Sequence, residues 1–490
     1  MRCSSSFAAL SLVVLGGCVV GPTFETPNTA LPAEWSGAAT TPASDVKSEF
    51  VAESIDRQWW LRFNDPVLTS LIGRAREANL DLRMAALRFA QSRVQRSVVA
   101  GGRVPSVTAS GSYQRQRQSE FGTGTRLIDA IGAPTNRDAI IDVLSEPYDV
   151  YQAGFDASWE IDLWGRVRRA VEAADASVAA NQEELHAVQL SIAAEVARTY
   201  FEFRGVQDLL RLAADDLAAS EDALGLTSLR AEGGLVTQLD VVSHRARLAD
   251  ARARIPQLQQ RETQLGRALE LLLGESPGAL DELLAAERAI PAPPAQVAIG
   301  IPTEIARQRP DIRGAEAQLH AATAEIGVAA ADLYPRITLT GGFLSQSLEA
   351  ADLSEWGARQ WAVGPSVHLP IFDGGRRRAI VELRELQQQE AAVNYQRTVL
   401  RAWHEIDAAL SGYIAEQRRN QELAAAAAES RDAYEIANVR YQHGLTNFLV
   451  AIDAQRTLLH AERAYSESTT AVSTQLTALY KSLGGGWEER

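Results

Sequence analysis

The sequence is poor in the residues from which most catalytic and metal sites are built. Its 490 residues include two cysteines and seven histidines. The histidines show no metal-ligand spacing, and no nucleophile elbow or phosphate-binding loop is present. Gly122-Thr123-Gly124 resembles such a loop only weakly, because no helical pattern follows it. We therefore expect no enzyme activity, no metal site and no cofactor.

Positive charge and proline are also scarce. The chain has 48 lysines and arginines against 62 acidic residues, a net charge of −14. A protein that binds nucleic acid needs a basic surface, so this balance argues against nucleic acid as a partner. Only 18 prolines interrupt long tracts rich in Ala, Leu, Glu, Gln and Arg. Such tracts predict extended coiled coil rather than compact globular domains.

The N-terminus has the features of an export signal. Residues 1–17 contain an apolar run that is too short to remain as a membrane-spanning helix. The run ends in Leu15-Gly16-Gly17-Cys18, which resembles the lipobox of bacterial lipoproteins. The resemblance implies a covalent diacylglyceryl group and an N-acyl chain on Cys18, and Val19 after it favours the outer membrane. Ordinary signal cleavage, with Cys18 incidental, is the alternative.

The chain contains two copies of one pattern. Pro105 aligns with Pro335 at an offset of 230 residues, and Gly154 aligns with Gly364 at an offset of 210. The 20-residue difference falls between these two anchor points, in a loop rich in Gly, Asp and Ser. We expect an N-terminal anchored segment, a first repeat, a linker, a second repeat and a tail: 18–67, 68–274, 275–301, 302–484 and 485–490.

Each repeat contains two segments in which apolar and polar residues alternate. Phe155, Ala157 and Trp159 alternate with Asp156 and Ser158. A period of two predicts strands with one apolar face. The four predicted strands span about 104–115, 149–163, 335–346 and 359–371. A half-buried sheet in a soluble domain would share this alternation. The lipobox and the flanking aromatic residues favour a membrane barrel, which four strands cannot close, so it must be shared between copies.

A long helical tract without proline follows each strand pair, at about 166–230 and 376–441. Val171, Val178 and Leu185 recur every seven residues, which is the spacing of a coiled-coil seam. Shorter helices are predicted at about 68–101, 237–273, 302–331 and 447–482. The sequence therefore predicts a mainly α fold with a transmembrane β-barrel contribution.

Four motifs carry a resemblance to a known family. They are Cys18-Val19-Val20-Gly21-Pro22-Thr23-Phe24, Trp59-Trp60, Arg309-Pro310-Asp311-Ile312-Arg313 and Leu369-Pro370-Ile371-Phe372-Asp373-Gly374-Gly375. With the two repeats, they make the chain similar to the TolC-like outer-membrane efflux factors, in their lipoprotein branch. The resemblance covers essentially the whole chain after the signal.

The resemblance implies a homotrimer with a twelve-stranded barrel, continuous with an α-helical barrel in the periplasm of a Gram-negative bacterium. It implies an exit duct in the outer membrane, contacting outer-membrane lipid. A periplasmic adaptor and an inner-membrane RND-type transporter would complete a tripartite efflux pump. A channel of a type I protein secretion system is the alternative within the family. A soluble coiled-coil scaffold is the alternative outside it, although it would lack the four amphipathic strands.

Two short helix–helix connections, 231–236 and 441–446, are predicted as tips. In the family such tips meet the adaptor. The resemblance assigns this docking role to a set of tip residues: Gly234, Leu235, Tyr441, Gly444, Leu445 and Thr446. The first copy has Ala231 where the family usually has tyrosine, so aromatic packing at that tip is in doubt.

The resemblance also implies a periplasmic gate close to these tips. The resemblance assigns its narrowest rings to Leu449 and Asp453, which lie one turn apart and should point along one helix face. Three copies of Asp453 around an axis would favour cations. Charged latch partners are expected at Asp240, Arg440 and Arg456. The alternative for each charge is a solvated or surface-paired helix residue.

Overall fold

The computed structural model describes residues 19–27, 48–51, 53, 56–122, 136–300 and 308–487. The predicted signal at 1–17 and the predicted lipid attachment at Cys18 lie outside the described residues. The chain divides into two compact units, each of which draws on both repeats. The first unit comprises 1–25, 93–177 and 319–390, and the second comprises 26–92, 178–318 and 391–490.

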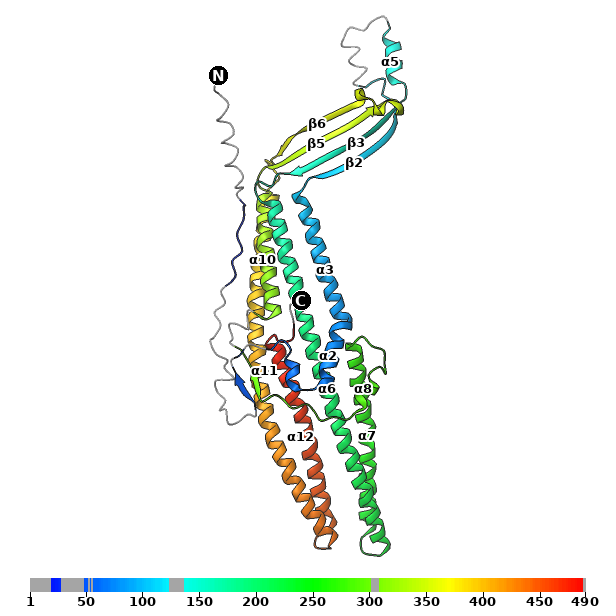
Figure 1. The fold of residues 1–490 in the computed structure, drawn as a ribbon, viewed down its shortest axis with the longest axis vertical. Helices are drawn as coiled ribbons and strands as arrows, with labels where there is room; N and C mark the ends of the chain where they lie inside the picture. Colours follow the sequence, from blue (N-terminus) through cyan, green and yellow to red (C-terminus); the bar gives the residue numbers. More distant parts are fainter. Residues whose placement is uncertain are drawn as a thin grey trace. The chain divides into compact units, whose positions relative to one another are not determined.

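The first unit contains a four-stranded antiparallel sheet in the order β2-β3-β5-β6 (Figure 1). The strands are β2 Ser106–Gln116, β3 Tyr148–Glu160, β5 Arg336–Ser347 and β6 Arg359–His368. All four lie close to their predicted positions, but β3 and β6 end three residues early. After β3, Asp162 accepts a hydrogen bond from Val167 N at 3.0 Å and so begins the next helix instead of extending the strand.

The register places aromatic residues of neighbouring strands side by side. Phe155 of β3 pairs with Phe343 of β5, which in turn pairs with Trp361 of β6. Phe155 is 57% exposed and Trp361 is 76% exposed in the single chain. On the opposite face, Ser158 pairs with Thr340. The sheet therefore has one exposed apolar face and one polar face, as the alternation predicts.

The helices reproduce the repeat offset of 210 residues. Helix α6 spans Arg166–Glu232 and α11 spans Arg376–Gln442, with 67 residues each. Helix α7 spans Gln238–Leu272 and α12 spans Phe448–Ser482, with 35 residues each. The starts and ends of α6 and α7 coincide with those of α11 and α12 after the offset is applied. One backbone plan is therefore used twice.

The helix predicted at about 68–101 is in fact two helices, α2 Pro66–Ala78 and α3 Leu80–Ala100. Asn79 separates them in an extended conformation, with ψ of 130°. Its side chain accepts a hydrogen bond from Leu82 N at 2.9 Å and donates one to Leu272 O at 2.8 Å. Asparagine favours such caps and disfavours helix interiors, which explains the break.

The remaining elements are short, apart from α10. They are β1 Glu49–Val51, η2 Trp59–Phe63, η3 Gly101–Arg103, α5 Arg137–Ser145, α8 Asp281–Ala285, β4 Gln296–Ala298, α10 Pro310–Ala331, η4 Ala350–Ser354 and η5 Trp356–Ala358. The parallel pairing of β1 with β4 was not predicted from the sequence. Within the described ranges, no helix is both long and apolar enough to cross a membrane.

The main hydrophobic core lies in the second unit and includes the Trp59-Trp60 motif. Trp59 is fully buried and stacks on Tyr480 at 5.2 Å between ring centroids. Nearby, Asp65 caps α2 by accepting from Val67 N at 2.7 Å, and it also accepts from Tyr200 OH at 2.7 Å. Asp65 thus links the start of α2 to α6, and Trp59, just before it, packs against α12.

Candidate functional site

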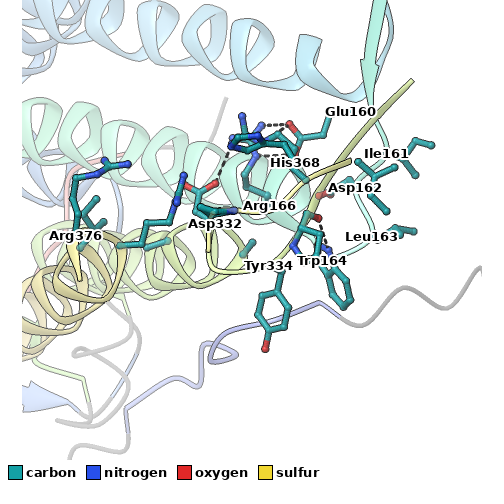
Figure 2. Close-up of a pocket in the computed structure, with 18 residues that line it drawn as sticks. Glu160, Ile161, Asp162, Leu163, Trp164, Arg166, Asp332, Tyr334, His368 and Arg376 are labelled. Carbon is teal, nitrogen blue, oxygen red and sulfur yellow. Dashed lines mark hydrogen bonds and ion pairs between the residues drawn. The ribbon is translucent and has the colours of Figure 1, made fainter. Parts of the chain in front are cut away.

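The junction between the sheet and the long helices is held by ion pairs (Figure 2). Arg166 at the start of α6 donates two hydrogen bonds to Glu160 at the end of β3, at 2.8 and 2.6 Å. Arg336 at the start of β5 lies 3.7 Å from Glu160 and 3.0 Å from Asp332. Trp164 stacks on Tyr334 and donates from Nε1 to Pro335 O at 2.9 Å. These contacts fix the direction in which the helices leave the sheet.

The residues that follow Cys18 are bound at this same junction. Val20 N donates to Trp164 O at 3.1 Å, and the Arg169 guanidinium donates to the Val20 and Gly21 carbonyls at 3.3 and 3.4 Å. Gly21 has a φ of 90° and packs so closely that a Cβ there would lie 2.5 Å from Gly327 Cα. The close approach of Gly21 to Gly327 therefore packs residues 20–21 against α10.

The two predicted tips have the same backbone. Leu235 N donates to Arg230 O at 2.8 Å, and Leu445 N donates to Arg440 O at 2.8 Å. Gly234 and Gly444 adopt φ of 71° and 72°, the left-handed conformation that ends helices. Leu235 and Leu445 are 78% and 69% exposed. Both turns therefore present an apolar side chain to the surroundings of the single chain.

The side chains of the two tips differ. The Arg230 guanidinium lies over the Tyr441 ring at 4.9 Å, and its Nη2 donates to Gln442 O at 3.5 Å. The equivalent contact would place Arg440 over the side chain of residue 231. Residue 231 is alanine and has no ring, so that contact cannot form. One cation–π contact thus joins the two helical hairpins of a single chain.

The predicted latch residues do not meet within one chain. Asp240 accepts hydrogen bonds from Thr237 N and Oγ1 at 2.8 and 2.7 Å, which lower the pKa of the carboxyl group. Arg440, Asp453 and Arg456 are exposed. In the described part of the chain, no hydrogen bond or ion pair engages the side chains of these three residues. The side chain of Leu449 is 69% exposed in the single chain.

A family model for outer membrane efflux protein matches residues 71–275 and 301–485, which is most of the chain and both repeats. The chain belongs to the outer membrane efflux protein family.

Similarity to individual family members extends over nearly the whole length. The chain is 33% identical to outer membrane protein OprJ of Pseudomonas aeruginosa, over 98% of this chain and 96% of that protein. It is 31% identical to the toluene efflux pump outer membrane protein TtgC of Pseudomonas putida, over 98% and 95%. Among solved structures, the outer-membrane channel OprN superposes with a TM-score of 0.85 at 34% identity, covering 96% of this chain and all of that one.

These comparisons confirm the predicted family, the mainly α fold and the outer membrane as its location. Proteins of the family are efflux components and not enzymes. Several of the matched relatives are named for efflux pumps, and these names give no support to a protein secretion system.

The sequence prediction did not include two residues at or near the tips, Leu239 and Arg230. Leu239 matches Leu449 after the offset of 210 and is 73% exposed. Applying the offset to the gate prediction would have found it. Arg230 could not be found in this way, because its contact joins non-equivalent positions of the two tips.

A buried charge cluster inside the helical hairpins was also missed. Asp216 of α6, with a side chain 7% exposed, lies 3.7 Å from Arg254 of α7, and Arg247 Nη2 donates to Gln455 Oε1 of α12 at 3.4 Å. Burial raises the pKa of Asp216 and lowers that of Arg247. His244 is almost fully buried, and burial together with the nearby Arg247 lowers its pKa to about 4.

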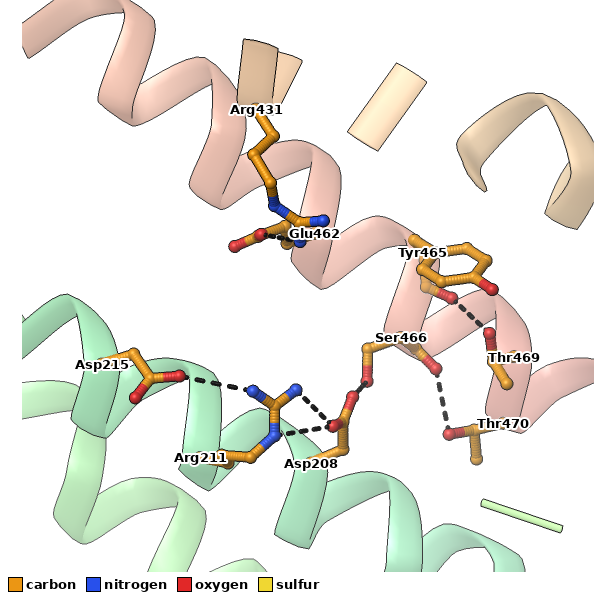
Figure 3. Close-up of polar contacts among 9 residues, drawn as sticks. All are labelled: Asp208, Arg211, Asp215, Arg431, Glu462, Tyr465, Ser466, Thr469 and Thr470. Carbon is orange, nitrogen blue, oxygen red and sulfur yellow. Dashed lines mark hydrogen bonds and ion pairs between the residues drawn. The ribbon is translucent and has the colours of Figure 1, made fainter. Parts of the chain in front are cut away.

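A second polar layer ties α6 to α12 (Figure 3). Ser466 Oγ of α12 donates to Asp208 of α6 at 2.6 Å, and Arg211 donates to Asp208 at 2.8 Å. Arg431 of α11 pairs with Glu462 of α12 at 2.5 Å. Hydrogen bonding to Asp208 raises the pKa of Arg211. The two arginine pairs each lie within one hairpin, and the hydrogen bond from Ser466 to Asp208 links the two hairpins.

Proposed function

We propose that three copies of this chain form the outer-membrane exit duct of a tripartite efflux pump. The observation that carries the proposal is the four-stranded sheet, which has an exposed apolar face and, among the described residues, a neighbour on only one side of β2 and of β6. Lipid tolerates an apolar face but not open strand edges. Joining β2 of one copy to β6 of the next removes every edge in a twelve-stranded barrel.

The lipid attachment at Cys18 belongs to the same proposal. Val20 is held at the junction between the sheet and the helices, and two residues of extended chain span at most about 7 Å. An acyl group on Cys18 would then enter the membrane beside the end of β3. Ile161 and Leu163, which continue the apolar alternation of β3, lie at this level of the chain.

The tips form the proposed contact with a periplasmic adaptor, which links the duct to an inner-membrane RND-type transporter. Exposed Leu235 and Leu445, displayed by identical turns, support a docking role. The proposed docking surface also includes Gly234, Gly444, Thr446 and Tyr441. Because two matching tips occur per chain, three copies would offer six related docking positions.

The gate is proposed to lie at Leu449 and Asp453, close to the tips. Asp240, Arg440 and Arg456 would act as latch partners between neighbouring copies, since they do not meet within one chain. The absence of ion pairs from Arg440 and Arg456 in the described chain leaves both guanidinium groups available for such contacts.

The cargo is proposed to be small organic molecules, including aromatic solvents and antibiotics. Matched relatives are named for toluene and antibiotic efflux pumps. Export can be tested in a strain that lacks its own duct but keeps the cognate adaptor and transporter. The parent chain should restore tolerance to toluene and lower the accumulation of a fluorescent dye.

The matched variant carries Leu235→Asp and Leu445→Asp, which change only the tips. It should assemble as the parent does but fail to export, because the tips would no longer dock. A parent chain that forms trimers in the outer membrane yet exports nothing in this strain would contradict the proposed function.

The gate is tested separately in planar bilayers with Asp453→Ala combined with Arg440→Ala. Losing a carboxylate ring should reduce cation preference, and loosening the latch should raise single-channel conductance. Trimer yield should stay normal. A double variant that conducts and selects as the parent does would show that these are surface charges.

A further inference from the structure

Four helices of one chain contact each other in the same order as the strands to which they are joined. Arg96 of α3 pairs with Asp175 of α6 at 2.6 Å, and His320 of α10 lies 3.0 Å from Glu172 of α6. Helices α10 and α11 share a small hydrophobic core: Ile312, Ala315, Tyr395, Val399 and Ala402. The order α3-α6-α10-α11 matches the strand order β2-β3-β5-β6. Helices α3 and α11 are therefore the two ends of this row.

Helix α11 exposes an apolar face that its counterpart α6 buries. Leu400 is 60% exposed, whereas Leu190, which matches it at the offset of 210, is 8% exposed. Three further α11 residues on this face are exposed while their α6 counterparts are buried: Leu383, Leu386 and Val393 against Ala173, Ala176 and Glu183. These α11 positions recur at intervals of three and seven residues, which is the spacing of a coiled-coil seam.

Helix α3 exposes a similar face at the other end of the row. Its exposed apolar residues recur at intervals of three, four or seven: Leu80, Met84, Leu87, Val94 and Val98. The offset of 230 matches them to five residues of α10, none of which is exposed: Pro310, Gly314, Ala317, Ala324 and Val328. This side of α10 packs on α6, because a Cβ on Gly314 would lie 3.6 Å from the Cβ of Glu183. The bare faces of α3 and α11 therefore match two faces that contact each other within the chain.

The two matched pairs of faces differ in side-chain size. The α6 and α10 faces are rich in alanine and glycine, whereas the α3 and α11 faces carry leucine, methionine and valine. Helix axes lie about 8–10 Å apart, depending on the side chains between them. Leucine-sized side chains therefore favour a wider spacing than alanine and glycine do, with more apolar surface to bury.

The charges beside the two bare faces are complementary. Arg313 of α10 pairs with Glu183 of α6 at 2.7 Å. Its counterpart on α3 is Arg83, and in the described part of the chain the Arg83 side chain has no ion pair or hydrogen bond. Glu390, one turn before Val393 on α11, likewise has no partner among the described residues. Each bare face thus carries one unpaired charge, and the two charges are opposite in sign.

We propose that α3 of one copy packs against α11 of the next copy, through a seam of large apolar side chains with Arg83 paired to Glu390. The inference rests on the proposed function, because it needs more than one copy of the chain. It adds that the helical part of the duct has two kinds of seam. The seam between α6 and α10 within a chain is close-packed, and the seam between copies is wider and buries more apolar surface.

The first test crosslinks the full-length protein in outer membranes through Met84→Cys combined with Val393→Cys, the counterparts of Gly314 and Glu183. A short bismaleimide should join the pair across copies and give covalent dimers and trimers on denaturing gels. The matched control combines Met84→Cys with Gln387→Cys. Gln387 lies on α11 but on another side of the helix, and its counterpart Ser177 is exposed. The control pair should remain monomeric on the same gels.

The second test measures assembly without crosslinking. Leu400→Asp should lower the yield of trimer on semi-native gels about tenfold, because a carboxylate would be buried in the seam without a partner. Gln387→Asp adds the same charge outside the seam and should leave the yield at the parent level. Since Leu400 is exposed in the single chain, total protein should be equal in both variants.

Trimers that form and export, but show equal crosslinking of the two cysteine pairs and a parental yield for Leu400→Asp, would overturn the seam and leave the proposed duct intact. A parent chain that remains monomeric in the outer membrane would contradict the seam and the duct together.

Discussion

The two repeats share a backbone but not the contacts of their side chains. Helices α6 and α11 have 67 residues each, α7 and α12 have 35 each, and the glycines of the two tips differ by 1° in φ. Their helix starts differ chemically. Asp240 accepts from Thr237 at the start of α7, whereas Asn447, the counterpart of Thr237, accepts from Val450 N at the start of α12.

The comparison separates the properties that both repeats share from those that only one repeat has. The helix lengths and the tip turns are equal, so each hairpin has the same length and ends in the same turn. Arg230 and Tyr441 make a contact that occurs once per chain, as does the buried His244, whose counterpart is Ala454. Individual side chains therefore give the two hairpins different strengths of attachment and different responses to pH.

The largest expected effect is in the sheet, where the repeats should behave alike. Phe155→Arg and Phe343→Arg alter register partners on the apolar face, and each should cost about 2–4 kcal/mol if the residue lies near the bilayer midplane. Both should sharply reduce the yield of trimer on semi-native gels. Ser158→Arg and Thr340→Arg, on the polar face, should assemble normally. Equal yields for the two faces would contradict the membrane orientation.

A smaller effect concerns pH and should be confined to the first hairpin. The pKa of His244 is lowered to about 4 from its ordinary value of 6.5. Between these two values the imidazole is protonated in the unfolded hairpin and neutral in the folded one. Stability is therefore complete above pH 6.5 and is lost as the pH falls toward 4. The loss should be on the order of 2–3 kcal/mol.

Hydrogen exchange along α7 between pH 7 and pH 4.5, corrected for intrinsic exchange rates, measures this loss. Protection of the first hairpin should fall in the parent and stay constant in His244→Ala. In α12 the position that matches His244 is Ala454, which does not titrate. The α12 amides should therefore show no such change in either protein. A fall of equal size in both hairpins would assign the response to other groups.

The contact between the tips should contribute less. Tyr441→Ala removes the ring beneath Arg230, a partly exposed cation–π contact worth about 0.5–1 kcal/mol. The two hairpins of one chain should then separate more easily, which spin labels on α6 and α11 would detect as a broader distance distribution. Arg230→Gln should have the same effect, and combining the two changes should add little. Full additivity of the two changes would show that the residues do not interact.

The smallest effect is expected at the start of α7. Hydrogen bonds from Thr237 depress the pKa of Asp240 below its ordinary 3.8, so this cap contributes stability above that pH and loses it as the pH falls through the lower folded value. Asp240→Ala should increase amide exchange in the first turn of α7 at pH 6 but leave the turn after Asn447 unchanged. Exchange that is insensitive to Asp240→Ala would remove the capping role.

The sequence predicted the parts of this fold that follow from periodicity. Alternation located the four strands within a few residues, and the offset of 210 located both tips. The break at Asn79 and the pairing of β1 with β4 escaped prediction because they depend on single side chains and on contacts distant in sequence. The gate prediction placed Asp240 in a latch, whereas within one chain its carboxylate is engaged by its own helix start. The contact between Arg230 and Tyr441 required coordinates.

The central claim is that β2 of one copy pairs with β6 of the next. Cys3 is expected to be removed with the signal and Cys18 to be acylated, so an introduced cysteine pair would be the only thiols in the mature protein. One cysteine at Ser110 on β2 and one at Gly364 on β6 lie on the opposite edge strands of a single sheet and cannot meet within one chain. Oxidation in intact outer membranes should yield covalent dimers and trimers on denaturing gels, and either single-cysteine variant should yield no trimer. A pair that stays monomeric after oxidation, with neighbouring register positions on the same two strands also failing to crosslink, would contradict the shared barrel.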